Sequence, residues 1–116
     1  NILKDASGNN SVALSTVAEG SAKAWCSYDG SGTTFADSFN MTSATDNGTG
    51  NFTINYTNNF SSNGTQSSTS SVFAVSSQDR THQYGAMSTS TILMVLMQGG
   101  SLIDIVGYGA VFGDLA

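Results

Sequence analysis

The chain has no proline, one cysteine, one histidine and only three basic residues among its 116. Because Cys26 stands alone, an intrachain disulfide and a zinc site built from cysteines are both excluded. Phosphate backbones are bound mainly through Lys and Arg. A chain with a net charge of −5 and no basic patch is therefore not expected to bind nucleic acid. The chain also lacks a run of 18 apolar residues, and we expect no insertion into a membrane.

The scarcity of ionisable side chains also argues against an enzyme, since charged residues make up only 9% of the chain. Serine is plentiful, but a serine nucleophile needs a base, and His82 is the only histidine. Hydrolysis of a glycan needs paired carboxylates, for which Asp29, Asp37 and Asp46 would have to converge. Each of these aspartates lies in or beside a turn signal, where an Asp side chain caps backbone groups. We therefore expect no catalytic residues and no cofactor.

What the chain has in abundance is Ser, Thr, Asn and Gly, which together supply 55 of its 116 residues. These residue types favour turns and strand surfaces and disfavour helices. Hydrophobic residues make up 39% of the chain, below the usual share of roughly 45–50%. The length predicts one domain, and so small a core predicts self-association, with a monomer that has long loops as the alternative.

Apolar residues recur at every second position in the first half of the chain, which is the pattern of half-buried strands. In residues 52–57 (FTINYT) each apolar residue is followed by Thr or Asn. In residues 23–28 the even-numbered Ala, Cys and Tyr share one face. Trp25 lies on the other face and is expected to pack inward or against a neighbouring chain. The same alternation predicts that Phe35 and Phe39 share a face.

Both ends of the chain are expected to form hairpins. Residues 1–19 carry apolar residues on both sides of the turn cluster at 7–10, and we find no helical periodicity anywhere. Near the other end, residues 91–97 form the most apolar strand. The pair Gly99-Gly100 predicts a tight hairpin from that strand to residues 102–106.

Between these ends, the polar residues 58–71 are expected to form a hairpin tip or a mobile loop, followed by a short strand at 72–75. The apolar runs 91–97 and 102–112 are expected to form an inner sheet or a subunit interface. Together these segments predict an all-β chain of roughly eight strands.

We divide the chain into an N-terminal hairpin or linker, residues 1–20, and one β domain, residues 21–116. The linker is expected to join the domain to a preceding fibre or to a neighbouring protein. The sequence begins at Asn1 without a signal-peptide pattern, as expected of a fragment or a processed form of a longer chain.

Several short motifs carry a family resemblance: KAW at 23–25, DSFN at 37–40, TDNGTG at 45–50 and FTINYT at 52–57. The segments KDASG at 4–8, STV at 15–17 and VFGDLA at 111–116 add to it. With these motifs the chain resembles the C-terminal domain of tail-fibre-like proteins of bacteriophages, in particular phages of cyanobacteria and other aquatic bacteria. Residues 58–87 match the pattern least. Cys26 departs from the pattern, which has an aliphatic residue at that position.

The resemblance implies an all-β domain that forms a homotrimer at the distal part of a virion fibre. Together with the strand pattern, it leads us to expect an antiparallel β-sandwich of the jelly-roll type, assembled as a parallel homotrimer. Its implied function is that of a tail-fibre tip or adhesion domain that binds a glycan or protein on the host cell surface. The alternatives are a capsid decoration or cement protein on the capsid surface, a module that joins fibres, and a carbohydrate-active enzyme. In the first two, the partners would be other virion proteins.

Five residues are expected to form a receptor-contacting surface: Phe60, Asn63, Gln66, His82 and Tyr84. The aromatic rings would stack on sugar rings, and the amide groups would bond sugar hydroxyls. An alternative for Phe60 is that its ring pins the polar segment to the body of the protein. His82 at a trimer axis and the oxygen-rich residues 46–51 are two candidates for a metal site. We expect instead a lone histidine that is exposed or hydrogen-bonded, and a simple turn, and no metal is predicted.

Overall fold

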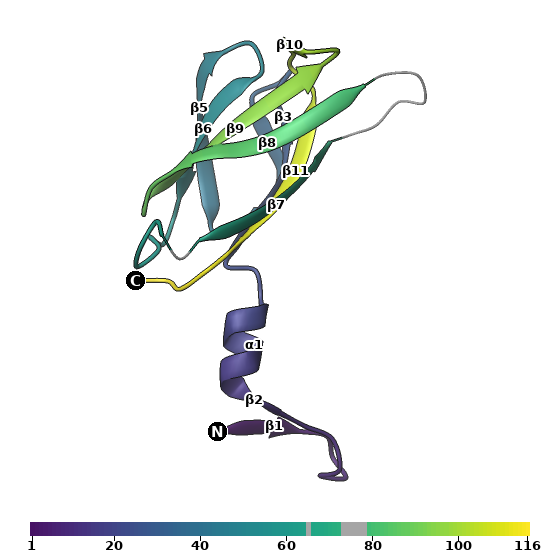
Figure 1. Cartoon of the computed structure of the whole chain (residues 1–116), viewed down its shortest axis with the longest axis vertical. Coiled ribbons are helices and arrows are strands. Elements are labelled where there is room, and N and C mark those ends of the chain that lie inside the picture. The colour runs from purple at the N-terminus through teal and green to yellow at the C-terminus, as the bar shows by residue number, and fades with distance from the viewer. Residues whose placement is uncertain (65, 73–78) are drawn as a thin grey trace.

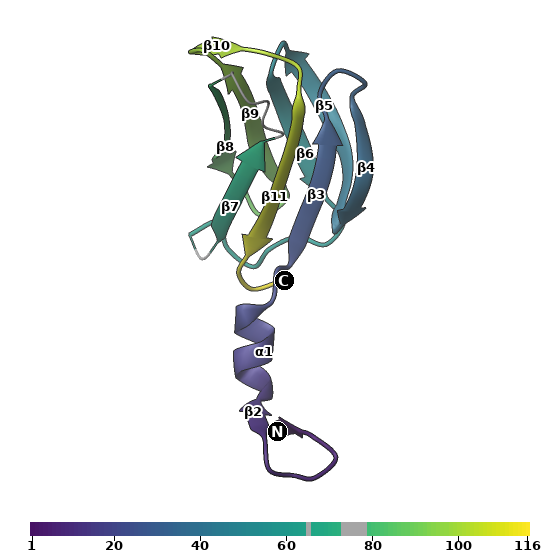
Figure 2. The same cartoon turned by 90° about the vertical axis from the view of Figure 1, so that its right-hand side faces the viewer.

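The computed structural model describes residues 1–64, 66–72 and 79–116. Within residues 22–116, the described strands form a body of two facing antiparallel sheets. Residues 1–21 form a stalk that projects from one end of this body (Figure 1, Figure 2). The molecule is accordingly elongated, with principal dimensions of 52 × 32 × 22 Å. In the described part of the chain, no helix has the length and apolar character needed to cross a membrane.

The chain is all-β apart from one short helix, as its composition predicts. The four-stranded sheet has the order β4-β3-β11-β7, and its pairings are antiparallel. Its strands are β3 (Ala24–Asp29), β4 (Thr34–Phe39), β7 (Ser67–Val72) and β11 (Val106–Phe112). The five-stranded sheet is built around β9, which pairs with β6, β8 and β10, while β5 pairs with β6. Its strands are β5 (Met41–Gly48), β6 (Asn51–Tyr56), β8 (Arg80–Met87), β9 (Thr91–Gln98) and β10 (Ser101–Leu102).

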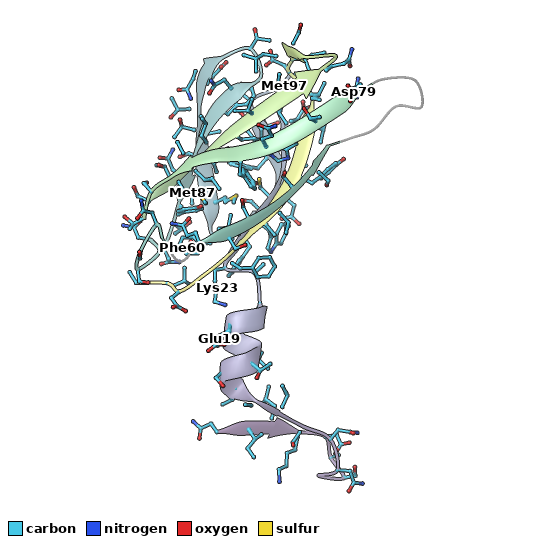
Figure 3. All side chains as sticks on the ribbon, viewed as in Figure 1. Glu19, Lys23, Phe60, Asp79, Met87 and Met97 are labelled. Atoms are coloured by element: carbon cyan, nitrogen blue, oxygen red, sulfur yellow. The ribbon has the colours of Figure 1, made fainter. Side chains whose placement is uncertain are left out.

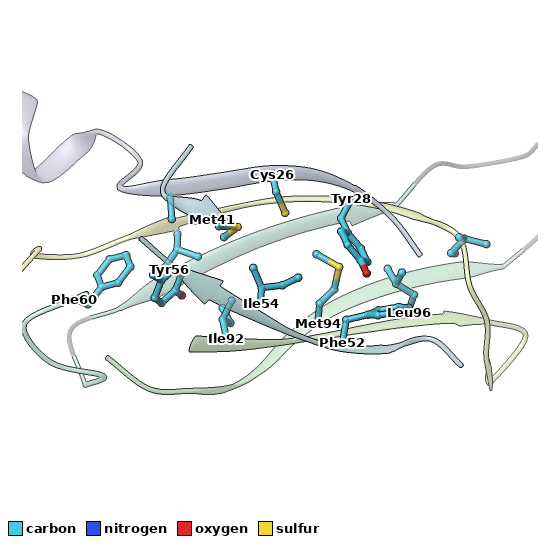
Figure 4. Packing of buried hydrophobic residues seen from close by; sticks show 13 residues of the cluster. Cys26, Tyr28, Met41, Phe52, Ile54, Tyr56, Phe60, Ile92, Met94 and Leu96 are labelled. Carbon is cyan, nitrogen blue, oxygen red and sulfur yellow. The ribbon is translucent and has the colours of Figure 1, made fainter. Parts of the chain in front are cut away.

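Alternate residues of β3, β6 and β9 point into the space between the two sheets and fill the core (Figure 4). β3 contributes Ala24, Cys26 and Tyr28, β6 contributes Phe52, Ile54 and Tyr56, and β9 contributes Ile92, Met94 and Leu96. The rings of Tyr28 and Phe52 meet edge to face across the core, with centroids 5.0 Å apart. The two-residue period identified the buried face of β6 correctly, and Ala24, Cys26 and Tyr28 share a face of β3 as predicted. Trp25 does not pack inward: it is 38% exposed on the outer face of β3.

β4 departs from the two-residue rule at a bulge. In the pairing of β4 with β3, Phe35 lies opposite Tyr28 and Phe39 lies opposite Trp25. Between these pairs, Ala36 is an extra residue in β4 that has no partner in β3 and shifts the register. An extra residue of this kind reverses which face the following side chains occupy. Phe35 consequently packs on Tyr28, whereas Phe39 is 50% exposed on the outer face. The prediction that the two phenylalanines share a face is wrong because of this bulge.

The apolar runs at 91–97 and 102–112 do not form a single sheet. β9 lies in the five-stranded sheet and β11 in the four-stranded one, so the runs approach each other across the core. Gly99 and Gly100 have positive φ angles of 56° and 80° and make the predicted tight turn. That turn pairs only β10 with β9, after which the chain crosses to the other sheet. The predicted hairpin to 102–106 therefore holds only at Leu102.

Much of the expected polar loop is in fact a strand. Residues 67–72 form β7, which pairs with β11 along its whole length at the edge of the four-stranded sheet. A strand rich in Ser and Thr is tolerated there because one of its faces points to solvent. Of the predicted strand at 72–75, Val72 is the last residue of β7, and residues 73–75 lie outside the described part of the chain.

The stalk begins with the predicted hairpin but continues as a helix. β1 (Ile2–Lys4) pairs with β2 (Ser11–Ala13), and α1 (Leu14–Gly20) follows directly. The expectation of no helix is wrong. Leu14, Val17 and Ala18 have the i, i+3, i+4 spacing of a helix face, in a run too short to stand out among its Ser and Thr neighbours.

Lys23 connects the stalk to the body. Its ammonium donates hydrogen bonds to the backbone carbonyls of Ala18 and Ser21, the latter at 2.8 Å. Carbonyls at the end of a helix lack partners within the helix, and a positive charge there also interacts favourably with the helix dipole. The backbone N–H of Lys23 donates to the carbonyl of Val111 in β11, so the same residue holds both the helix end and the sheet.

Candidate functional site

Phe60, the aromatic residue predicted to stack on a sugar, lies inside the body (Figure 3). It is 1% exposed, and its ring packs edge-on against Tyr56 with centroids 4.8 Å apart. Its backbone N–H donates to the carbonyl of Thr89, and it forms an isolated bridge with Leu115 near the C-terminus. A ring buried in this way is closed to a ligand. The buried ring of Phe60 anchors the polar segment to the body, which is the alternative role that the sequence suggested for it.

Gln66 is also buried and serves as a connector. Its side-chain oxygen accepts a hydrogen bond from the Tyr56 hydroxyl at 3.2 Å, and its amide nitrogen donates to the carbonyl of Ser88 at 2.8 Å. The same amide donates to the carbonyl of Ser62 at 3.3 Å. Buried amides of this kind are costly to leave unpaired, so Gln66 holds the segment before β7 to the turn between β8 and β9.

His82 and Tyr84 project from β8 toward β11 across the core. The His82 ring is 8% exposed, and its Nδ1 lies 2.8 Å from the backbone carbonyl of Ser71. A carbonyl only accepts, so the neutral ring carries its proton on Nδ1. Burial lowers the pKa of His82 below its ordinary value of 6.5, although the backbone carbonyls of Ser71 and Tyr108 oppose the shift. The imidazole is therefore neutral at pH 7.

The Tyr84 ring lies beside His82, with centroids 4.8 Å apart, and its hydroxyl is 3.5 Å from the Cys26 sulfur. Burial is the main cause that raises the pKa of Tyr84, and burial also raises the pKa of the Cys26 thiol. Both groups remain protonated at neutral pH. Neither the histidine, the tyrosine nor the cysteine is an activated acid, base or nucleophile.

The five predicted contact residues therefore do not make one exposed surface, because Asn63 alone has an exposed side chain. The predicted turn roles appear for Asp29 and Asp46, whereas Asp37 lies within β4 and is paired with Ser27. One carboxylate oxygen of Asp29 accepts hydrogen bonds from the N–H and hydroxyl of Ser31, and Asp46 accepts from the N–H of Gly48 at 2.8 Å. Within residues 1–64, 66–72 and 79–116, no group of three or more His, Cys, Asp or Glu side chains is placed to hold a metal.

The exposed aromatic residues lie elsewhere, on the outer face of the four-stranded sheet. Trp25 is 38% exposed and Phe39 is 50% exposed, and they occupy directly paired positions on β3 and β4. Ala110 and Thr69 continue the same row across β11 and β7. We name these four residues, Phe39, Trp25, Ala110 and Thr69, the aromatic row. The sequence signal for it is the position of Trp25 between the buried Ala24 and Cys26, which places it on the outer face.

Polar groups lie directly beside the aromatic row. The neighbouring row on the same outer face consists of Asp37, Ser27, Tyr108 and Ser71. On the other side, the partly buried Phe112 is paired with Ser67. Aromatic rings, hydroxyls and one carboxylate are thus presented together on a rigid sheet, with no basic side chain among them.

Comparisons with family models, with curated proteins and with solved structures give no match for this chain. The arguments about its function consequently rest on the surfaces described here and on the sequence motifs.

A second apolar stripe lies on the outer face of the five-stranded sheet. Leu93, Val95 and Met97 alternate with the buried residues of β9 and are partly exposed. Leu102, paired with Met97, extends the stripe and is 46% exposed. The residues of β6 that lie beside this stripe are polar, namely Asn51, Thr53 and Asn55. This stripe is aliphatic and therefore differs chemically from the aromatic row.

Proposed function

We propose that this chain is a structural and adhesive domain of a bacteriophage virion, located at the tip of a tail fibre, that binds the surface of the host cell. In this proposal the two facing sheets are a β-sandwich of the jelly-roll type, three copies associate, and the domain has no catalytic activity. The sequence motifs support the virion assignment. The aromatic row is the observation that carries the adhesive function.

The chemistry of the aromatic row suits a glycan. An exposed indole or phenyl ring offers a flat apolar face on which the C–H groups of a sugar ring can pack, and adjacent hydroxyls and a carboxylate bond the sugar hydroxyls. The rings project from paired strands, so binding orders little backbone. Weak contacts of this kind become effective when three copies present them together, because the second and third contacts form at high effective concentration.

The test compares single substitutions in the full chain by the binding of the purified protein to host cells and to a glycan array. Trp25→Ala should lower binding about tenfold or more, the result of losing roughly 1.4 kcal/mol per site. Leu102→Ala, which removes an exposed apolar residue from the other sheet, is the matched control. Equal binding by Trp25→Ala and the parent protein, or no binding by the parent, would overturn the proposal. If only Asn63→Ala lowered binding, the contact with the host surface would lie in the polar segment, residues 58–71, and not in the aromatic row.

The aliphatic stripe on β9 and β10 favours a second function, that of a decoration or joining module held against other virion proteins. Exposed aliphatic area on a rigid sheet is typical of a protein–protein contact. Under this alternative, Leu93→Ser and Leu102→Ser should abolish incorporation into particles, while Trp25→Ala should not. The position of the domain in an intact particle, determined by electron cryomicroscopy, decides between the two functions.

A further inference from the structure

The tripeptide Asn-Gly-Thr occurs twice in the chain, at residues 47–49 and 63–65. An asparagine that precedes glycine is prone to lose its side-chain amide, because glycine has no side chain to hinder the attack of its backbone nitrogen on the asparagine. The residues that follow the two asparagines are identical, and both asparagine side chains are exposed. A difference in their reactivity must therefore come from the hydrogen bonds and the backbone around them.

Asn47 is held in place by the strands beside it. It lies in the bulge near the end of β5, between two positions that pair with β6. Its side-chain amide donates hydrogen bonds to the Asn51 side-chain oxygen at 3.2 Å and to the Thr53 hydroxyl at 2.9 Å. The backbone N–H of Gly48, which would have to attack, donates to the Asp46 carboxylate at 2.8 Å. A charged acceptor strengthens this bond and opposes removal of the proton.

Asn63 has none of these restraints. It lies between β6 and β7, outside both strands, in a short segment whose ends are anchored by the buried Phe60 and Gln66. In the described part of the chain, the Asn63 side-chain amide has no hydrogen-bond partner. The backbone N–H of Gly64 donates to the neutral hydroxyl of Ser62 at 3.1 Å, and such a bond is weaker than one to a carboxylate. Both reacting groups are thus free to approach each other.

We infer that Asn63 is a site of spontaneous deamidation, and that the fold protects Asn47 from the same reaction. The backbone nitrogen of Gly64 loses its proton and attacks the side-chain carbonyl carbon of Asn63. A new carbon–nitrogen bond closes a succinimide ring, while the bond to the side-chain nitrogen breaks and that nitrogen leaves with the proton as ammonia. Water then opens the ring. Opening at the side-chain carbonyl gives aspartate, and opening at the main-chain carbonyl gives isoaspartate, in which the backbone continues through the former side chain.

The two positions also differ in how well the fold accommodates the product. Isoaspartate lengthens the backbone by one carbon atom. Around position 63 this length is taken up between the anchors, where Phe60 is bonded to the carbonyl of Thr89 and Gln66 to that of Ser88. In β5 the same insertion would shift the pairing with β6. The reaction needs neither an enzyme nor a partner and is independent of the proposed adhesive function. It adds a carboxylate to the exposed polar segment of a chain whose net charge is already −5.

The first experiment incubates the full chain at pH 8 and follows both Asn-Gly-Thr copies by peptide mapping with mass spectrometry. In the folded protein, Asn63 should convert at least about tenfold faster than Asn47, a difference of roughly 1.4 kcal/mol in the activation barrier. In urea, where both copies are unfolded, the two rates should become similar. Equal rates in the folded protein, or faster conversion of Asn47, would overturn the inference. A ratio that persists in urea would also overturn it, because the difference would then come from the neighbouring sequence and not from the fold.

A substitution of Gly64 tests the attack by its backbone nitrogen. Among the described residues, a Cβ at position 64 would come near only the Ser62 hydroxyl oxygen, at an ordinary 3.6 Å, so Gly64→Ala should fold as the parent does. Its methyl group hinders the nitrogen, and conversion of Asn63 should slow about tenfold or more while that of Asn47 stays unchanged. Ser61→Ala, an exposed change in the same segment, is the matched control and should leave both rates unchanged. Conversion of Asn63 at the parent rate in Gly64→Ala would show that the backbone nitrogen is not the nucleophile and would overturn the inference.

Discussion

The ring of Tyr84 lies so close to the backbone of Gly109 that no other residue fits at position 109. A Cβ atom there would lie 2.6 Å from the Tyr84 hydroxyl oxygen and 2.7 Å from the ring carbon that bears it. Gly107, two residues earlier on β11, provides the same space for His82 and Leu96. Two glycines in alternate positions of β11 therefore let three side chains of the opposite sheet approach its backbone.

Substitution of Gly109 should lower the stability of the body. Gly109→Ala should reduce the free energy of unfolding by about 1–3 kcal/mol, the usual cost of overpacking a closed site. Gly85→Ala is the control, because a Cβ there would make an ordinary 3.6 Å contact with Leu93. The control should change stability by well under 1 kcal/mol. Denaturant unfolding measures both, and equal effects of the two substitutions would contradict the packing described here.

The contact between Tyr84 and Gly109 also predicts a coupling between the two positions. Tyr84→Leu removes the ring that the added methyl group strikes, so Gly109→Ala should cost less in that background. The coupling energy from the double-mutant cycle should be on the order of 1 kcal/mol. Additive effects would show that the cost at position 109 arises from another neighbour.

The burial of His82 predicts a dependence of stability on pH. Its pKa in the folded protein lies below the ordinary value of 6.5, so the unfolded chain takes up a proton more readily. The ring is only 8% exposed, so the charge of its protonated form is poorly solvated, and this burial outweighs the nearby carbonyls of Ser71 and Tyr108. Stability is complete above pH 6.5 and declines as the pH falls from 6.5 toward the folded pKa, by at most about 1.4 kcal/mol per pH unit.

Urea unfolding at several pH values between 7.5 and 5 measures this decline. His82→Gln has no titrating group in this range, and its stability should stay level. Asp5 and Asp29 do not contribute to the decline in this range, because hydrogen bonds lower their pKa values below the ordinary value of 3.8. Parallel curves for the parent and the variant would contradict the prediction.

The sequence predicted the parts of the fold that depend on local pattern. The alternation in β6, the shared face of Ala24, Cys26 and Tyr28 in β3, and the Gly99-Gly100 turn are local, because each residue's face or backbone conformation follows from its immediate neighbours. The orientation of Phe39 was not predictable from alternation, since one additional residue, Ala36, reverses it. The helix α1 has only two turns and a sequence rich in Ser and Thr, so its period was too short to detect.

The burial of Phe60 depends on partners that are distant in the sequence. Its bridge to Leu115 spans 55 positions along the chain, and the approach of β8 to β11 that encloses His82 depends on glycines of β11. Composition placed these residues in a polar region and therefore at the surface. Trp25 differs from Phe60, because its parity already separated it from Ala24 and Cys26. The expectation that it packs inward was nevertheless wrong, since it is 38% exposed on the outer face.

Asn40 should be more sensitive to substitution than its place in a turn suggests. It has a positive φ of 55°, its side-chain oxygen accepts from the N–H of Asn58 at 2.6 Å, and its amide donates to the carbonyls of Lys23 and Asn58. It thus joins the start of β3, the corner between β4 and β5, and the residues after β6. Asn40→Gly keeps the backbone conformation but loses three bonds, and should cost about 1–3 kcal/mol. Asn40→Ala adds backbone strain of roughly 1 kcal/mol. A smaller loss for Ala than for Gly in denaturant unfolding would contradict this account.

The reactivity of the Cys26 thiol tests whether the face of β3 that carries Ala24, Cys26 and Tyr28 points into the core. The side chain is 3% exposed, and burial raises its pKa, so the reactive thiolate is scarce in the folded protein. Labelling by a thiol reagent at pH 8 should be slow, and its rate should rise with denaturant as the unfolded population rises. Trp25→Cys in a Cys26→Ala background is the matched comparison, one position along the same strand. That outer-face thiol should react at nearly the rate of an unfolded peptide. If the thiol at position 26 reacts as fast as the one at position 25 without denaturant, β3 does not separate a core face from an outer face.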